Sequence, residues 1–160
     1  MTQYHVRPIN NEDRQWLAKF TTDQWGSDVM AVHGVTLRLS QQEGFLAQMD
    51  WETVGLLTYR IDGDACEITS LDSLLEGRGI GSALILAVLE VARSQGCRRL
   101  YVVTTNDNLH ALRFYQRRGF TLCALRPGAV AEVRKIKPEI PITGYDDIPI
   151  RDEIELEMLL

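Results

Sequence analysis

The sequence of 160 residues lacks long apolar runs, a surplus of basic residues and paired-cysteine motifs. No stretch approaches the ~18 apolar residues of a membrane-spanning helix, so we expect no membrane partner. Residues 1–14 are polar and charged, which is not typical of a secretory signal. The net charge of −5 disfavours a nucleic-acid partner. The three cysteines include no Cys-x-x-Cys pair, which predicts free thiols in a reducing cytoplasm.

Metal-binding motifs are also missing. His5, His33 and His110 are far apart, and none has a second ligand at metal-binding spacing, so we expect no metal cofactor. What remains is ordinary globular composition, with 45% hydrophobic and 24% charged residues. A chain of this length is large enough for one core, which predicts a single domain over residues 1–160.

The charges are unevenly distributed along the chain. Residues 93–137 carry ten basic side chains against Asp107 and Glu132, whereas residues 138–160 carry seven acidic side chains against Arg151. This asymmetry fits an anionic cofactor together with a cationic substrate. It fits equally well two solvated faces without a binding role, and the basic stretch keeps nucleic-acid binding as a third hypothesis.

Hydrophobic periodicity predicts a mixed α/β fold. We expect strands at residues 4–8, 45–50, 54–62, 65–73, 99–105, 120–125 and near 154–158. Residues Leu84, Ala87, Val88 and Val91 recur at helical spacing, which predicts a helix over 80–94 with Gly96 just beyond it. Further helices are expected after Asn10 or Asn11, over 108–118 and over 129–137, whereas 25–39 is expected to be irregular and 138–149 a loop.

Three glycines mark the junction between the strand at 65–73 and the helix at 80–94. Gly77, Gly79 and Gly81 leave backbone N–H groups bare at the positive end of a helix, next to Arg78. Such a junction is an anion-binding site, and phosphate is its expected ligand. A tight turn that requires positive φ without binding anything is the alternative.

Two common phosphate-binding motifs do not match this junction. A P-loop requires Gly-Lys-[Ser/Thr] after the spacer, and this lysine is missing. Ser82 gives a partial match to the dinucleotide fingerprint. That fingerprint opens the first unit of a parallel sheet, whereas here it follows a meander of short strands. The context therefore disfavours a nicotinamide or flavin cofactor.

Two motifs in the right order resemble the GNAT superfamily of acetyl-coenzyme A-dependent N-acetyltransferases. The first is Glu76-Gly77-Arg78-Gly79-Ile80-Gly81, similar to the family's Gln/Arg-x-x-Gly-x-Gly/Ala signature. The second is Asn108-x-x-Ala111-x-x-Phe114-Tyr115 followed by Gly119-Phe120. Glu76 departs from the family's Gln or Arg, and we expect its carboxylate to point away from a bound pyrophosphate. The resemblance implies the family's fold, a mostly antiparallel sheet that splays between its fourth and fifth strands and is flanked by helices.

The resemblance also implies how acetyl-CoA is held. The amides of the turn cradle the pyrophosphate, and free backbone groups of the fourth strand pair with the pantetheine arm. Asn108 bonds the pantetheine or caps its helix, and Ala111 leaves room for the ligand. The cofactor-binding residues expected on this basis are Leu71, Ser73, Arg78, Gly79, Ile80, Gly81, Ser82, Asn108 and Ala111.

Tyr115 matches the family's tyrosine near the thioester sulfur, which implies a general acid for the leaving thiolate. A phenol is protonated at neutral pH, as a donor must be. Glu67 lies early on the fourth strand, where several family members place a catalytic glutamate. Asp72 is the alternative base, and strand alternation predicts that it faces the opposite side from Glu67. Many enzymes of this type work without a dedicated base.

The acceptor is expected to be the amine of a small molecule or peptide. Residues 11–39 and 138–150 are the segments expected to recognise it, with Tyr145, Asp146 and Asp147 at the tip of a candidate lid. Two adjacent carboxylates would attract a cationic amine. A non-catalytic acetyl-CoA-binding regulatory module of the same fold is the rival hypothesis. Homodimer formation through the C-terminal strands, common in this fold, is left open.

Overall fold

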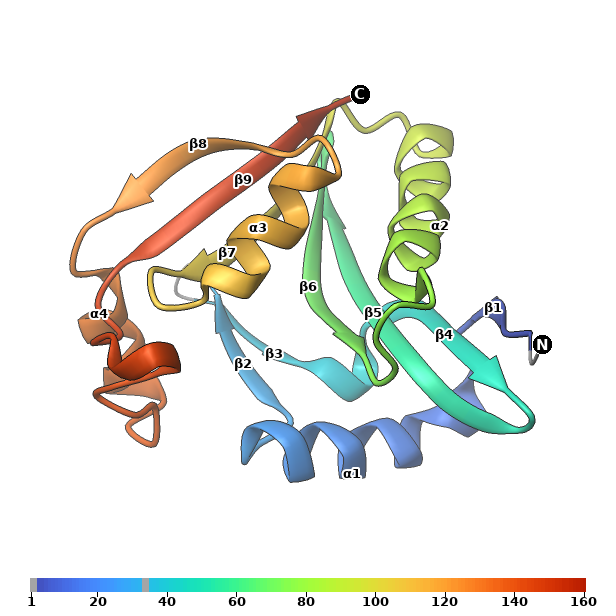
Figure 1. The fold of residues 1–160 in the computed structure, drawn as a ribbon, viewed down its shortest axis with the longest axis horizontal. Helices are drawn as coiled ribbons and strands as arrows, with labels where there is room; N and C mark the ends of the chain where they lie inside the picture. Colours follow the sequence, from blue (N-terminus) through green and yellow to red (C-terminus); the bar gives the residue numbers. More distant parts are fainter. Residues whose placement is uncertain (1–2, 33–34) are drawn as a thin grey trace. The chain divides into compact units, whose positions relative to one another are not determined.

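The chain folds into two compact units. The computed structural model describes residues 3–32 and 35–160 (Figure 1). The first unit comprises Met1–Met30, Arg38–Leu100 and Leu160, and the second comprises Ala31–Leu37 and Tyr101–Leu159. The single domain expected over 1–160 stays a prediction. The predicted mixed α/β class is confirmed, because strands and helices alternate in both units.

The first unit is built on an antiparallel sheet in the order β1-β4-β5-β6. Its strands are β1 (His5–Pro8), β4 (Glu43–Met49), β5 (Glu52–Asp62) and β6 (Ala65–Ser73). β5 and β6 are joined by a tight turn in which Gly63 has a φ of 63°, a value that favours glycine. The three consecutive strands expected between residues 45 and 73 are therefore confirmed.

One helix covers each face of this sheet. Leu56 of β5 packs in a cluster with Ile9, Leu46 and Leu17, which comes from α1 (Arg14–Trp25). The opposite face carries Gly55, where an added Cβ would lie 2.5 Å from Cγ2 of Ile80 in α2 (Ile80–Ser94). A side chain at position 55 would therefore push α2 off the sheet.

Both helices begin where the sequence predicts. A short 3₁₀ helix, η1 (Asn11–Asp13), leads into α1, and the side chain of Asn10 accepts hydrogen bonds from the amides of Glu12 and Asp13. α2 has the bounds expected from its periodicity, with Leu84 and Val88 fully buried.

A β-bulge in β6 resets the alternation of its side chains. Thr58 pairs with Ser70 and Tyr59 pairs with Ile68, so Thr69 is an extra residue on β6. Paired residues of two strands point to the same face. Asp72 pairs with Leu56 and Glu67 pairs with Arg60, and those two partners are both on the α1 face of β5.

The predicted opposition of Glu67 and Asp72 is therefore wrong. Simple alternation over five positions would separate them, but the extra residue Thr69 shifts the count by one. Both carboxylates point to the face of the sheet that α1 covers.

The main sheet of the second unit has the strand order β7-β9-β8. This unit contains β7 (Arg99–Thr105), α3 (Leu109–Arg117), β8 (Thr121–Arg126), α4 (Ala129–Ile136), the 3₁₀ helix η3 (Tyr145–Asp147) and β9 (Glu153–Leu159). The expected splay concerns β6 and β7, the fourth and fifth strands expected from the sequence, and stays a prediction.

One stretch differs from its expectation. The region 25–39 was expected to be irregular, but it contains β2 (Val29–Val32) and β3 (Val35–Arg38), which form a separate two-stranded sheet. Each strand has four residues, which is too short for a recognisable alternation of hydrophobic and polar side chains.

Candidate functional site

The glycine-rich turn between β6 and α2 is exposed over residues 73–79. Gly77 and Gly79 both have a φ of 72°, and Gly79 is the N-cap residue of α2. The side chain of Ser73 donates a hydrogen bond to the carbonyl of Leu75 at 2.9 Å, which turns the chain out of β6. The positive φ values confirm that both positions require glycine, and they leave the turn without side chains that would cover its amides.

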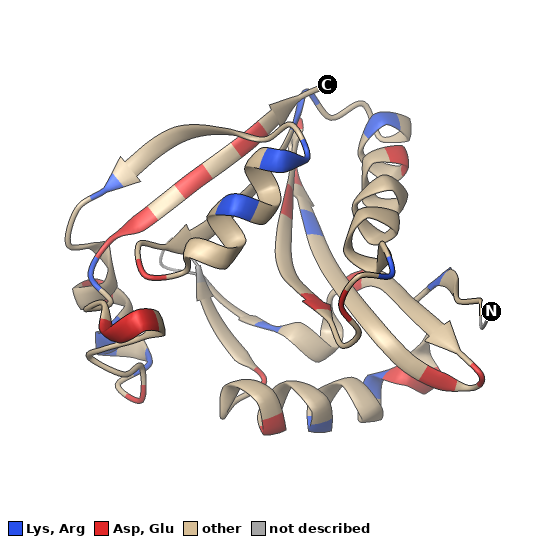
Figure 2. Cartoon of the chain, viewed as in Figure 1, with Lys and Arg blue, Asp and Glu red and all other residues tan. Residues whose placement is uncertain are grey.

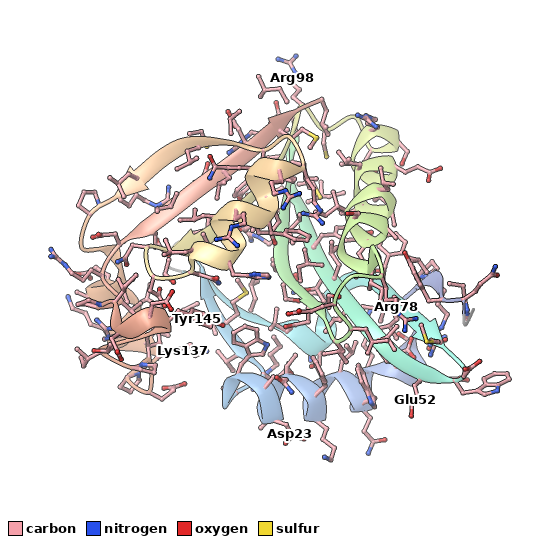
Figure 3. The ribbon with its side chains drawn as sticks, in the orientation of Figure 1. Asp23, Glu52, Arg78, Arg98, Lys137 and Tyr145 are labelled. Carbon is pink, nitrogen blue, oxygen red and sulfur yellow. The ribbon has the colours of Figure 1, made fainter. Side chains whose placement is uncertain are left out.

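Backbone N–H groups of α2 point out of this turn. The first bond within the helix runs from the amide of Ala83 to the carbonyl of Gly79. No side chain caps the helix, so the amides of Ile80 and Gly81 have no acceptor within it. Arg78 is exposed beside them (Figure 3). These donors, the helix dipole and the guanidinium together form a site suited to an anion.

Backbone groups of β6 extend this site along the strand. The amide of Leu74 donates to the carbonyl of Val54, which marks a hydrogen-bonded pair. Such pairs alternate in antiparallel strands, so Leu56 and Asp72 form the next one. Leu71 and Ser73 lie between them. Their N–H and C=O groups therefore point away from β5, as the pantetheine prediction requires.

Asn108 caps α3. Its side-chain oxygen accepts a hydrogen bond from the amide of Ala111 at 3.1 Å. Capping was one of the two roles expected for Asn108. Because the side-chain oxygen is used by the cap, a hydrogen bond to a cofactor would come from the side-chain amide nitrogen. Ala111 is half-buried one turn into the helix.

Tyr115 is buried in an aromatic cluster of the second unit, with 6% of its surface exposed. Its ring meets those of Phe114 and Phe120 edge to face, each at 5.2 Å between centroids. Packing of this kind fixes the direction of the phenol. The cluster holds one end of α3 while Asn108 holds the other.

The two candidate bases on β6 lie in different surroundings. The side chain of Glu67 is 2% exposed, and its Oε1 lies 3.3 Å from Nε of Arg60. The Oδ2 atom of Asp72 is buried, and no hydrogen bond to it is found within the described residues. Burial raises the pKa of Asp72 to about 6.

The segment expected to be a lid is held by hydrogen bonds at its base. Arg134 of α4 donates to the carbonyls of Ile140, Pro141 and Ile150. Buried Asp107 accepts a hydrogen bond from the amide of Tyr145 at 3.2 Å. The segment is therefore anchored at its ends and at its tip, as a fixed acidic turn would be.

Sequence reasoning missed the role of Asp107, which had counted only as a charge opposing the basic stretch. Its position two residues after the end of β7 and one residue before the N-cap of α3 was the available signal. Beyond Tyr145, Asp146 and Asp147 are exposed and have φ values of 55° and 60°. Both are in the left-handed region, which costs energy for residues other than glycine.

The basic and acidic segments of the second unit partly neutralise each other. Arg126 of β8 lies 3.5 Å from a carboxylate oxygen of Glu153 and 3.1 Å from one of Glu155, both on β9. Figure 2 shows the acidic positions repeating along β9. This pairing supports solvated charged faces over a nucleic-acid site for this part of the chain.

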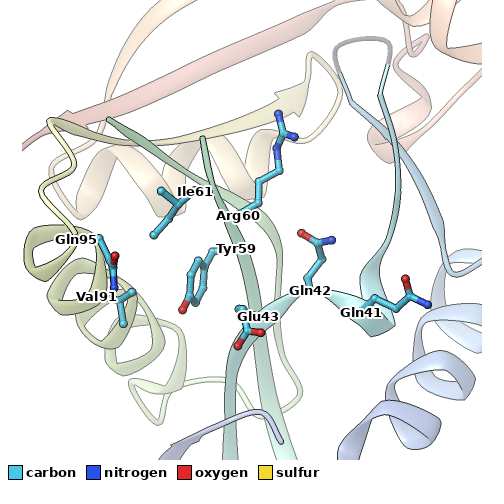
Figure 4. A pocket seen from close by; sticks show the side chains of 8 residues that line it. All are labelled: Gln41, Gln42, Glu43, Tyr59, Arg60, Ile61, Val91 and Gln95. Atoms are coloured by element: carbon cyan, nitrogen blue, oxygen red, sulfur yellow. The ribbon is translucent and has the colours of Figure 1, made fainter. Parts of the chain in front are cut away.

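A pocket of about 400 Å³ opens at the opposite end of α2 from the glycine turn (Figure 4). Tyr59, Val91 and Gln95 line it together with Glu43, and burial raises the pKa of Tyr59. None of the predicted site residues lines this pocket.

Within residues 3–32 and 35–160, no group of three His, Cys, Asp or Glu side chains is placed to hold a metal ion. His33 lies outside the described residues. In the same part of the chain no helix is long and apolar enough to cross a membrane.

Comparison with known proteins identifies the family. Residues 11–120 match the model of the acetyltransferase (GNAT) family. The Bacillus subtilis protein YdhI is 43% identical over 150 residues, which cover 93% of this chain and 94% of YdhI. The chain belongs to the GNAT acetyltransferase family.

Other members of the GNAT family add detail. A GNAT acetyltransferase from Elizabethkingia anophelis, solved with acetyl-CoA bound, shares the fold with a TM-score of 0.70 and 24% identity, over 98% of both chains. A spermine/spermidine N(1)-acetyltransferase of Bacillus subtilis is 35% identical over 51 residues, which cover 31% of this chain and 34% of that protein. The family membership makes this protein an N-acetyltransferase, and the glycine turn lies within the residues that match the family model.

Proposed function

We propose that this protein transfers the acetyl group of acetyl-CoA to a primary amine by direct attack in a ternary complex. The observation that carries the proposal is the glycine turn. It presents backbone amides at the start of α2 and an exposed arginine, and it follows a strand in which the backbone groups of Leu71 and Ser73 point away from β5. An N-acetyltransferase of this family needs such a site for the pyrophosphate and the pantetheine arm of its co-substrate.

The amides of residues 78–82 bind the pyrophosphate, with Arg78 supplying positive charge. The turn is exposed and carries no side chain at Gly77 or Gly79, so phosphate oxygens approach the backbone directly. Leu71 and Ser73 pair with the amides of the pantetheine arm. Asn108 and Ala111 complete the set of cofactor-binding residues.

Tyr115 is the general acid. Acetyl-CoA supplies the activated acetyl group, and the amine forms a bond to its carbonyl carbon. When the carbon–sulfur bond breaks, the thiolate takes the phenolic proton, and the proton lost by the amide nitrogen restores the phenol. The packing of Tyr115 against Phe114 and Phe120 supports this role, because a donor must be held in one direction.

A carboxylate of β6 is the proposed base. Glu67 is the residue that the family resemblance favours, and it stays a prediction. Its side chain is buried, and Oε1 lies 3.3 Å from the guanidinium nitrogen Nε of Arg60.

The proposed acceptor is a cationic amine. Exposed Asp146 and Asp147 form a fixed acidic turn, held through Tyr145 by Asp107. Two adjacent carboxylates attract a positively charged substrate. The 51-residue similarity to a spermine/spermidine acetyltransferase supports polyamines as the first class to test.

The test is calorimetric titration with acetyl-CoA, followed by a thiol-release assay with spermidine, spermine, an aminoglycoside, lysine and a short peptide. We expect micromolar binding of acetyl-CoA, none of NADH, and turnover of at least one amine. Tyr115→Phe is expected to lower kcat about 10²-fold with little change in acetyl-CoA affinity. Tyr59→Phe, which changes a partly buried tyrosine outside the proposed site, is the matched control.

Two results would count against the proposal. A folded protein that binds no acetyl-CoA would contradict the assignment of the glycine turn. A protein that binds acetyl-CoA but acetylates no amine would favour the rival hypothesis, a non-catalytic acetyl-CoA-binding regulatory module.

A further inference from the structure

A polar strip runs along β5 and β6 on the face that α1 covers. Its floor is the bulge, where the hydroxyl of Thr58 lies 2.7 Å from that of Thr69 and 2.5 Å from that of Ser70. Glu67 lies to one side of the bulge and Asp72 to the other. Hydroxyls and carboxylates on a buried sheet face cost free energy unless they are bonded or used, so the strip requires an explanation.

Every side chain of the strip except that of Asp72 takes part in a polar interaction within it. The hydroxyl of Thr58 bonds those of Thr69 and Ser70, and Oε1 of Glu67 pairs with the guanidinium of Arg60. Asp72 takes part in none of these interactions, and its buried Oδ2 receives no hydrogen bond from the described residues. A buried carboxylate oxygen without a hydrogen-bond donor is typical of a binding site whose ligand supplies the donor. An ammonium ion is such a donor, and its charge is opposite to that of the carboxylate.

No cation of the packed elements neutralises Asp72. Burial is the only cause of its raised pKa, so no neighbouring charge contributes to the shift. The charged groups of α1 are engaged elsewhere: Arg14 donates to the carbonyls of Ser40 and Gln42, and Lys19 pairs with Asp23 at an exposed position. On β5 and β6 this face also carries the charges of Arg60 and Glu67, which pair with each other on the far side of the bulge from Asp72.

The position of Asp72 along the chain places it beside the reacting groups. It lies between Leu71 and Ser73, whose backbone groups point away from β5, to the side of β6 where the pantetheine arm is proposed to bind. Its own amide points to β5 and its side chain to the α1 face. The side chain of Asp72 would therefore lie on the α1 side of a thioester bound along β6.

We infer that Asp72 is the catalytic residue that binds the ammonium group of the acceptor and removes its proton. This inference rests on the proposed function and deepens it. The carboxylate of Asp72 takes one proton from the ammonium ion, which leaves a neutral amine and a carboxylic acid. The lone pair of the amine then forms the bond to the thioester carbon, and the proton on Asp72 leaves to solvent after the product departs.

The experiment compares Asp72→Asn with Asp62→Asn, a control that removes an exposed carboxylate at the end of β5. Rates are measured from pH 5 to 9 with the best amine of the panel described above. We expect kcat/KM of Asp72→Asn to fall 10²- to 10⁴-fold at pH 7, with unchanged calorimetric affinity for acetyl-CoA. The acidic limb of the wild-type profile should be lost in Asp72→Asn and kept in Asp62→Asn.

A second measurement does not depend on turnover. Carbon-13 NMR of the aspartate carboxyl groups, assigned by the missing signal in Asp72→Asn, follows the titration of Asp72 directly. The signal should titrate well above the other aspartates. Titration in their ordinary range, or an Asp72→Asn enzyme with the wild-type pH profile, overturns the inference and leaves the proposed function intact. Absence of acetyl transfer by the wild-type enzyme overturns both.

Discussion

Glu67 and Asp72 point to the same face of the sheet although five positions separate them along β6. The extra residue at Thr69 produces this arrangement, and the hydroxyl of Thr58 bonds both Thr69 and Ser70 across it. The bulge therefore brings two carboxylates of one strand to one side. Arg60 pairs with Glu67, and Asp72 is left without a cation.

The cost of burying Asp72 predicts that its removal stabilises the protein. The folded state holds the pKa of Asp72 at about 6, above the ordinary value of 3.8, so the folded state binds the proton more tightly than the unfolded state does. Stability is therefore lost as the pH rises from about 4 through 6. Asp72→Asn avoids this loss and should be more stable than the wild type by up to about 3 kcal/mol at pH 8.

The measurement is urea unfolding of both proteins at pH 4 and at pH 8. At pH 4 the difference should be small, because Asp72 is then protonated in the folded state and about half protonated in the unfolded state. Asp62→Asn, at an exposed position, should match the wild type at both pH values. An Asp72→Asn variant that is less stable at pH 8 would show that the carboxylate has a structural partner. A gain in stability together with a loss of activity is the signature of a residue kept for function.

Local patterns predicted the elements that hold the glycine turn. The bounds of α2 followed from Leu84, Val88 and their helical spacing, and the turn followed from three closely spaced glycines. These signals are local, because they depend on residues within one or two helical turns. The direction in which Leu71 and Ser73 point needed the pairing of β6 with β5, which no spacing within β6 contains.

Replacement of Gly79 tests the glycine turn. Its φ of 72° disfavours a side chain, and a methyl group there would stand between the helix amides and a phosphate. Gly79→Ala should weaken acetyl-CoA binding at least about 10-fold and cost about 1 kcal/mol of stability. Gly26→Ala is the matched control, because Gly26 has a φ of 77°, open space around it and a place at the end of α1.

Both variants should lose similar stability in thermal unfolding, whereas only Gly79→Ala should lose affinity in calorimetry. Equal affinity in the two variants would mean that the turn merely connects β6 to α2. That result would restore the alternative of a turn that requires positive φ and binds nothing.

Glu76 is the one position where the turn departs from the family signature. Its side chain is exposed, so its charge acts on a bound pyrophosphate through solvent. Glu76→Gln removes this repulsion and should tighten acetyl-CoA binding about 2- to 5-fold at low salt, and less at high salt. Glu12→Gln, an exposed charge on η1, should leave the affinity unchanged. Weaker binding by Glu76→Gln would show that the carboxylate takes part in holding the cofactor.

Pairing with Arg60 predicts a mainly structural role for Glu67. Glu67→Gln should lower the free energy of unfolding by about 2 kcal/mol, because the partly buried guanidinium of Arg60 would lose its carboxylate partner. Arg60→Gln should cost less, because the arginine side chain is 25% exposed. A double-mutant cycle with the two changes should give a coupling energy of about 1 kcal/mol.

The acidic limb of the pH profile separates the two carboxylates. Glu67→Gln is expected to keep that limb, and Asp72→Asn is expected to lose it. Loss of the acidic limb in Glu67→Gln alone would identify Glu67, the residue that the family resemblance favours, as the base.

Long-range contacts explain what the sequence could not predict. The bulge at Thr69 depends on its register with Thr58, and the anchoring of Tyr145 by Asp107 joins residues 38 positions apart. Neither contact leaves a periodic trace along the chain. Asp72 was recognised only as an alternative base, because its distinction lies in the absence of a partner, which only the folded structure shows.

The cysteines test the packing of the first unit independently of the site. Burial raises the pKa of Cys66 to about 12 and also raises that of Cys97, so neither forms a reactive thiolate near neutral pH. Cys123 is exposed on β8. Ellman's reagent at pH 8 should therefore modify one thiol rapidly in the native protein and three in urea. Cys123→Ser should abolish the rapid phase, and a second rapid thiol in the native protein would mean that the α2 face of the sheet opens far more readily than its packing indicates.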